Sequence, residues 1–129
     1  MPATAANLEK MIDFTVGFAQ TQGFDKETVD QIHLACEEAL VNVIKYAYPG
    51  AEGTVEIRCD RAQSGGIEIE ITDAGIPFDP LSLPAPDTSL PMEQRKIGGL
   101  GVFMIRKIMT EVKYRRDNGR NVLTLIKSK

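Results

Sequence analysis

The chain has 129 residues, of which 43% are hydrophobic and 26% charged. This length and balance are typical of one folded domain, so we expect residues 1–129 to form a single domain and exclude a disordered chain. A net charge of −3 and a pI near 5.2 argue against the basic surface that nucleic-acid binding requires. No apolar run approaches the length of a membrane span, and the N-terminus lacks a signal-peptide pattern, so we expect neither nucleic acid nor a membrane as a partner.

The two cysteines, Cys36 and Cys59, do not form a CxxC motif. One falls on the apolar face of a predicted helix and the other in a predicted strand. Such cysteines are typical of buried free thiols in a reducing compartment, which predicts a cytoplasmic location. The single histidine, His33, has no second ligand at useful spacing, so a metal site built on histidine and cysteine is not expected.

Two helices are predicted in the N-terminal part of the chain. Apolar residues recur at helical spacing from Asn7 to Thr21, and Gly23 ends this first helix. The second runs from Asp25 to Tyr48, with Asp25 as its N-cap, and Pro49-Gly50 stops it. Its core-facing stripe comprises Val29, Ile32, Cys36, Leu40, Val43 and Ala47.

Three polar residues share the other face of the second helix. Glu38, Asn42 and Lys45 are three and four positions apart, which makes them neighbours on a helix. The helix around them is apolar almost all round, so a carboxylate and an amide one turn apart need a partner. A solvated polar edge is the simpler explanation of the helix taken alone, and a binding site is the alternative.

A predicted hairpin follows, and then a proline-rich stretch. The alternating runs Thr54–Asp60 and Ile67–Thr72, with Ser64-Gly65-Gly66 between them, predict two antiparallel strands with one buried face. Five of the chain's seven prolines lie between Pro77 and Pro91. An aperiodic stretch of this length inside a domain is often a lid, so we expect Phe78 to Lys96 to close over a ligand.

Glycines stand at the start of a third predicted helix, Leu100 to Met109. Free N–H groups at a helix start attract anions, and the missing side chains at Gly98, Gly99 and Gly101 would let a phosphate approach. Glycine-rich helix starts are also often simple turns. The pattern is not a dinucleotide fingerprint, because Met104 stands where the third glycine would be, and a GxxxxGK[ST] loop is absent.

Two more strands close the chain. Val112–Arg116 and Val122–Lys127 are joined by Asp117-Asn118-Gly119-Arg120, a strong hairpin turn. The element order predicts an α+β fold, a two-layer sandwich of a mostly antiparallel sheet with helices on one face. At the end of its strand, Asp73 could accept a hydrogen bond from a ligand amine or could simply be a turn aspartate.

In this order the segments resemble the ATP-binding domain shared by gyrase, the heat-shock chaperones, histidine kinases and mismatch-repair ATPases. More closely, the chain is similar to the anti-sigma-factor serine/threonine kinases of bacterial partner-switching systems in three segments: EEALVNVIKYAY, DAGIPFDP and GGLGVFMI. The resemblance runs from about residue 5 to the C-terminus and implies a histidine-kinase-like ATPase fold.

The resemblance implies ATP and Mg²⁺ as cofactors and assigns roles to individual residues. Asn42 matches the asparagine that binds Mg²⁺, and Glu38 matches the general base toward the attacking hydroxyl. Asp73 matches the aspartate that receives the adenine amino group, with Gly75 letting the base lie close. The other implied ATP-binding residues are Lys45, Phe78, Gly98, Gly99, Leu100 and Gly101, and Arg95 or Lys96 is expected to meet the γ-phosphate.

The resemblance also implies a function. The protein would be a serine kinase that phosphorylates an anti-anti-sigma partner, in alternation holds a sigma factor inactive, and works as a homodimer. The alternatives are an ATP-dependent partner switch without kinase activity and a stand-alone ATPase. Glu38 favours the kinase, because a pure binder needs no base.

The chain departs from the family pattern in three places. Tyr46 replaces a histidine common among relatives, Pro77 replaces the second glycine of DxGxG, and a strand before the first helix is expected to be missing.

Overall fold

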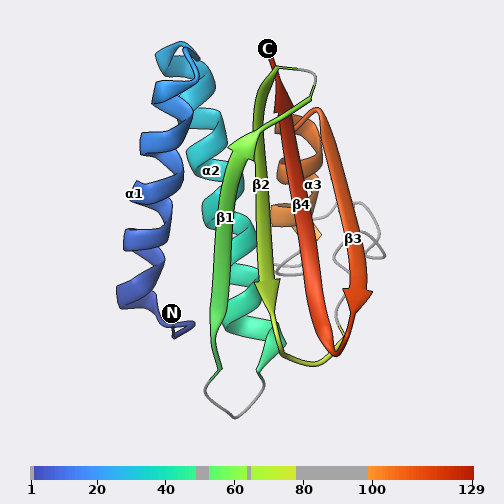
Figure 1. The fold of residues 1–129 in the computed structure, drawn as a ribbon. Helices are drawn as coiled ribbons and strands as arrows, with labels where there is room; N and C mark the ends of the chain where they lie inside the picture. Colours follow the sequence, from blue (N-terminus) through green and yellow to red (C-terminus); the bar gives the residue numbers. More distant parts are fainter. Residues whose placement is uncertain (1, 49–52, 64, 78–98) are drawn as a thin grey trace, which may run out of the picture.

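The computed structural model describes residues 2–48, 53–63, 65–77 and 99–129. Within these ranges a four-stranded antiparallel sheet carries the helices on one face (Figure 1), which confirms the predicted α+β architecture. The elements are α1 (Ala5–Thr21), α2 (Lys26–Asn42), η1 (Val43–Ala47), β1 (Val55–Arg61), β2 (Gly66–Asp73), α3 (Gly99–Ile108), β3 (Glu111–Asp117) and β4 (Arg120–Ser128). The predicted helix stop at Pro49-Gly50, the turn residue Ser64 and the predicted lid, Phe78–Lys96, lie outside the described residues.

The strands lie in the order β1-β2-β4-β3, so the last strand of the chain sits between β2 and β3. The β3–β4 turn is the predicted one: Asn118 and Gly119 have φ angles of 50° and 77°, the pair of positive values that a type I′ turn needs. The register of β2 against β4 places Asp73 opposite Asn121. One end of the sheet therefore brings together two polar residues that are 48 positions apart.

Helix α2 forms the centre of the core, between α1 and α3 and against the sheet. Every residue of its predicted stripe is buried: Val29, Ile32, Cys36, Leu40, Val43 and Ala47. The sheet contributes the alternate apolar residues of its two central strands: Ile67, Ile69, Ile71, Leu123 and Leu125. Asp25 caps the helix as predicted, since its side chain accepts a hydrogen bond from the Thr28 N–H at 2.8 Å. In the part of the chain that the structure describes, no helix is both long and apolar enough to cross a bilayer.

The last turn of the central helix is wider than an α-helix. We expected one α-helix to Tyr48, but Val43–Ala47 form a π-helical turn, η1, so that expectation was wrong for this turn. Single π turns occur frequently at functional sites. The carbonyl groups of a terminal turn lack partners within the helix, and here the Ala47 carbonyl accepts a hydrogen bond from the Ile76 N–H at 2.9 Å.

A single bridge occupies the place of the strand that we expected to be missing before the first helix. Pro2 pairs with Thr54 in an isolated antiparallel bridge, and the Ala3 N–H donates to the Gly53 carbonyl at 2.9 Å. Among the described residues this pairing does not extend into a strand. The segment before α1 therefore lies beside the start of β1.

Both cysteines are free and share one partner in the core. The Sγ atoms of Cys36 and Cys59 lie 3.8 and 3.7 Å from the Thr15 hydroxyl oxygen. That hydroxyl donates in turn to the Met11 carbonyl at 3.0 Å. Burial raises the pKa of Cys36 to about 12 and also raises the pKa of the half-buried Cys59. Cys36 is a buried structural thiol, as predicted, whereas Cys59, which was also predicted to be buried, is only half-buried.

Cys36 is expected to make the free energy of unfolding decrease in alkaline solution. Its pKa is about 12 when folded and near 9.0 in an unfolded chain, so its contribution is complete below pH 9 and is lost as the pH rises toward 12. Between about pH 8 and about pH 10 the parent should lose about 1 kcal/mol more than Cys36→Ala, as measured by urea unfolding. Equal losses in the two proteins would contradict this prediction.

Candidate functional site

The ends of β2 and β4 place two polar side chains inside the core. Asp73 is 6% exposed and Asn121 is 4% exposed. Asp73 Oδ1 accepts two hydrogen bonds, from the Gly75 N–H and from Asn121 Nδ2, both at 2.9 Å. Both bonds end on Oδ1, so among the described residues Oδ2 is the acceptor left for a ligand. Asp73 is therefore more than the turn aspartate that its sequence position allowed.

Asn42, the last residue of α2, brings a second polar group to the same place. Its side chain is 6% exposed, and its Nδ2 atom is buried with no hydrogen-bond partner within the described structure. An unpaired buried amide costs about 1–3 kcal/mol, so its position indicates a missing partner. Rotation about the last side-chain bond exchanges the amide nitrogen and oxygen, so this position can offer either a donor or a hard oxygen ligand. The orphaned amide therefore fits a polar ligand or a cation.

These groups line one small cavity on the helix side of the sheet. Its volume is about 30 Å³, and its polar lining consists of Asn42, Asp73, Tyr114 and Asn121. Its apolar lining consists of Ala39, Val43, Ala47, Ile71 and Leu123. A space of this size holds about one water molecule. Asn42 and Asp73 thus line the same small cavity, and their roles toward a ligand stay predictions.

Gly75 lets the loop after β2 lie directly on the π turn. A Cβ atom at Gly75 would stand 2.1 Å from the Ala47 carbonyl oxygen, which real contacts do not allow. The adjacent Ile76 N–H bonds to that same oxygen, and the Gly75 carbonyl accepts from Arg116 Nη1 at 2.8 Å. Gly75 thus has a packing role against the helix, and its role toward a bound base stays a prediction.

Gly75→Ala is expected to lower the free energy of unfolding by about 1–3 kcal/mol, because the new methyl group forces apart the loop and the Ala47 carbonyl. Gly17→Ala is the matched control: Gly17 lies within α1, and a Cβ there meets nothing within 4 Å. That substitution should stabilise the protein by up to about 1 kcal/mol through helix propensity. Urea unfolding measures both, and a Gly75→Ala protein as stable as the parent would show that the close approach is not needed.

Tyr48 anchors the other side of this loop, and the sequence analysis did not identify it. Its hydroxyl donates to the Thr54 carbonyl at 2.6 Å and accepts from the Ala74 N–H at 2.8 Å. Its ring occupies the space beside Gly53, where a Cβ atom would come within 2.2 Å of the ring. Tyr48 therefore ties the end of the central helix to both the start of β1 and the residue after Asp73.

Glu38 lies one turn before Asn42 on α2 and is half-buried. Its carboxylate makes no hydrogen bond or ion pair with any residue that the structure describes, whereas neighbouring Glu37 approaches His33 at 3.9 Å.

Helix α3 begins at Gly99, so Gly101 lies in its first turn, and α3 packs against α2. For Lys45, Tyr46, Gly99, Leu100 and Gly101 the structure describes the backbone alone; Phe78, Arg95, Lys96 and Gly98 lie outside the described residues.

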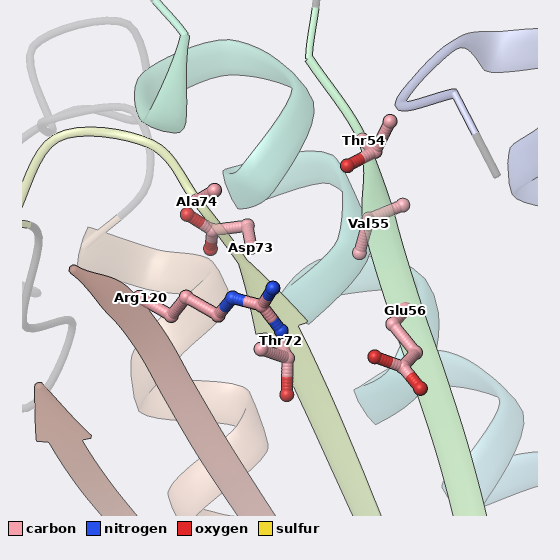
Figure 2. A pocket seen from close by; sticks show the side chains of 7 residues that line it. All are labelled: Thr54, Val55, Glu56, Thr72, Asp73, Ala74 and Arg120. Atoms are coloured by element: carbon pink, nitrogen blue, oxygen red, sulfur yellow. The ribbon is translucent and has the colours of Figure 1, made fainter. Parts of the chain in front are cut away.

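A larger cavity, of about 350 Å³, lies on the opposite face of the sheet (Figure 2). Thr54, Glu56 and Thr72 line it and alternate along their strands with inward-facing residues, so they belong to the face without helices. Figure 2 shows the Arg120 side chain reaching from β4 across β2 toward Thr72. Asp73 borders this cavity too, but Asn42 does not. We place the candidate site in the helix-side cavity, because that cavity is lined by both Asp73 and Asn42, whose Nδ2 has no partner among the described residues.

Comparison with known proteins identifies a family and relatives of modest sequence identity. Residues 1–127 match the family described as the histidine kinase-like ATPase domain. The serine-protein kinase RsbW of Listeria monocytogenes is 32% identical over 114 residues, which cover 83% of this chain and 71% of that protein. The serine-protein kinase RsbW of Bacillus cereus is 29% identical over 111 residues, covering 83% of this chain and 69% of that protein.

Solved structures agree on the fold. The histidine kinase domain of the Erythrobacter litoralis EL346 blue-light activated histidine kinase superposes with a TM-score of 0.54 at 18% identity, over 77% of this chain and 43% of that one. A second structure of the EL346 kinase gives a TM-score of 0.56 at 15% identity, over 93% of this chain and 40% of that one. This chain thus spans less than half of those chains. The chain belongs to the histidine kinase-like ATPase domain family and, within it, to the anti-sigma-factor kinases related to RsbW.

Proposed function

We propose that this protein is a Mg²⁺-dependent serine kinase that transfers a phosphoryl group from ATP to an anti-anti-sigma partner and, in alternation, holds a sigma factor inactive. The observation that carries the proposal is the cavity lined by both Asn42 and Asp73, since Asn42 Nδ2 and Asp73 Oδ2 have no hydrogen-bond partner among the described residues. The name of the RsbW relatives, serine-protein kinase, supports serine as the acceptor.

Asp73 would bind the base of the nucleotide. Its Oδ2 accepts no hydrogen bond from the described residues, so it suits a ligand edge that brings an N–H donor, such as the amino group of adenine. A ligand edge without a donor would exclude water from Oδ2 and give it no hydrogen bond in return, which is costly. The apolar lining, including Ile71 and Leu123, suits the flat faces of a base.

Asn42 and the start of α3 would hold the metal and the phosphates. An amide oxygen is a hard ligand of the kind that Mg²⁺ takes, and bound Mg-ATP supplies the phosphoryl group to be transferred. The free N–H groups of the first turn of α3, at Gly99 and Gly101, suit phosphate oxygens. Glu38, with no partner among the described residues, would accept the proton of the attacking serine hydroxyl.

Incubation with γ-labelled Mg-ATP and an anti-anti-sigma protein from the same organism tests this proposal. We expect label on a serine of that partner, identified by mass spectrometry. Nucleotide-dependent partner binding without label would instead show a binding switch, and label released only as inorganic phosphate would show a simple ATPase. Either result would overturn the kinase assignment.

A further inference from the structure

The Asn121 side chain is held at both ends beside Asp73. Its Nδ2 donates to Asp73 Oδ1 at 2.9 Å and to the Ile76 carbonyl at 2.7 Å. Its Oδ1 accepts a hydrogen bond from the Tyr114 hydroxyl. The amide nitrogen faces two acceptors, the Asp73 carboxylate and the Ile76 carbonyl, and the amide oxygen faces a hydroxyl donor. Only one orientation of the amide satisfies all three bonds. Asn121 therefore presents only N–H groups to Asp73.

This contact determines which oxygen of Asp73 faces a ligand. Oδ1 receives two N–H donors, one from the loop at Gly75 and one from β4 at Asn121, and these hold the carboxylate from two directions. The β2–β4 register keeps Asp73 and Asn121 opposite each other. The bond to the Ile76 carbonyl holds the loop over the same amide. Among the residues that the structure describes, Oδ2 is thus left as an acceptor in a fixed position.

We propose that Asn121 is a positioning residue that sets the base preference of the site, favouring 6-amino over 6-oxo purine nucleotides, with Tyr114 fixing the orientation of its amide. The inference rests on the proposed function, since it concerns the same nucleotide site. Asn121 acts through Asp73: it keeps Oδ2 where an amino group can donate to it. A 6-oxo group cannot donate, so its binding gains nothing from this alignment.

The two nucleotide classes should therefore respond differently when Asn121 is changed. Asn121→Leu keeps approximately the same volume but removes the donor to Asp73 and the acceptor for Tyr114. ATP affinity should decrease because its amino group loses a fixed acceptor. ITP, the 6-oxo analogue, never forms that bond, so its affinity should change little. General damage to the pocket would weaken both nucleotides equally.

Calorimetric titration of the full chain with Mg-ATP and Mg-ITP measures this difference. Asn121→Leu is expected to lose roughly tenfold in ATP affinity, with ITP affinity within about twofold of the parent. Tyr114→Phe, which removes only the hydroxyl, should lower the ATP-to-ITP preference by about threefold. Thr124→Val is the matched control, because Thr124 is a buried polar residue of the same strand that faces the other side of the sheet; it should change neither affinity.

Each outcome decides between the alternatives. Equal losses for ATP and ITP in Asn121→Leu, or an unchanged ATP-to-ITP preference in Tyr114→Phe, would overturn the positioning role of Asn121. The proposed function would still stand in that case, provided that the parent binds ATP. A parent that binds neither nucleotide would refute the proposed function and this inference together. If Asn121→Leu does not fold, Tyr114→Phe decides, because it creates little space and keeps every bond of Asn121 except one.

Discussion

Glu38→Gln is expected to lower phosphotransfer to a partner serine by roughly 10²–10⁴-fold, the usual contribution of a positioned base. Glutamine keeps the length and hydrogen-bonding reach of glutamate but cannot take the proton of a hydroxyl. Because Glu38 contacts no partner among the described residues, the substitution breaks no bond that we observe. Affinity for Mg-ATP should therefore stay within about twofold of the parent. Single-turnover transfer and calorimetry measure the two quantities separately.

Glu37→Gln is the matched control for this experiment. Glu37 is the adjacent residue of α2, and among the described residues its one ion pair is with exposed His33, at 3.9 Å. Removing its charge should leave both phosphotransfer and ATP affinity at parental values, because exposed ion pairs contribute little. Parental transfer rates in Glu38→Gln, or an equal loss in Glu37→Gln, would show that Glu38 is not the base.

Asp73→Asn is expected to weaken ATP binding by roughly ten- to a hundredfold, corresponding to about 1–3 kcal/mol. In the parent, one carboxylate oxygen serves Gly75 and Asn121, and the other is left for the ligand. An asparagine has only one acceptor oxygen. If that oxygen serves Gly75 and Asn121, the new NH₂ group meets the amino group of the base; if it faces the base, the NH₂ group meets the donors of Gly75 and Asn121. In either orientation of the new amide, its NH₂ group therefore faces another hydrogen-bond donor.

Calorimetry with a folding control measures the effect of Asp73→Asn. Circular dichroism and the urea midpoint establish that the variant is folded. A folded Asp73→Asn protein with parental ATP affinity would mean that the base does not bind here. Loss of folding would instead assign Asp73 to the structural network at the end of β2.

Much of this fold could be predicted from periodicity. Apolar residues repeat every three to four positions in the helices and every second position in the strands, so their buried faces follow from the sequence. The α2 stripe, the Asp25 cap and the Asn118-Gly119 turn are all found as predicted. Asn42 was identified by its match to the family asparagine, since the helix alone favoured a solvated polar edge. The structure finds its Nδ2 buried and without a partner among the described residues.

What the sequence did not reveal depends on contacts between distant segments. The strand order places Asn121 beside Asp73, and local periodicity carries no information on which strands pair. A polar residue in line with Leu123 and Leu125 was the available signal for Asn121. The π turn was missed because Val43 and Ala47 are buried in either helix type. The packing role of Gly75 follows from that turn, so it could not be predicted either.

ATP is proposed to enter the helix-side cavity and not the larger cavity on the open face of the sheet. The most direct test is an NMR titration of ¹⁵N-labelled protein with Mg-ATP, following the side-chain amide signals of Asn42 and Asn121. We expect saturable shifts of both amides, with only small shifts at Glu56 and Thr54, which line the open-face cavity. Saturable shifts centred on Glu56, Thr54 and Arg120 with the Asn42 amide unmoved, or no saturable shift at all, would contradict the assignment of the site.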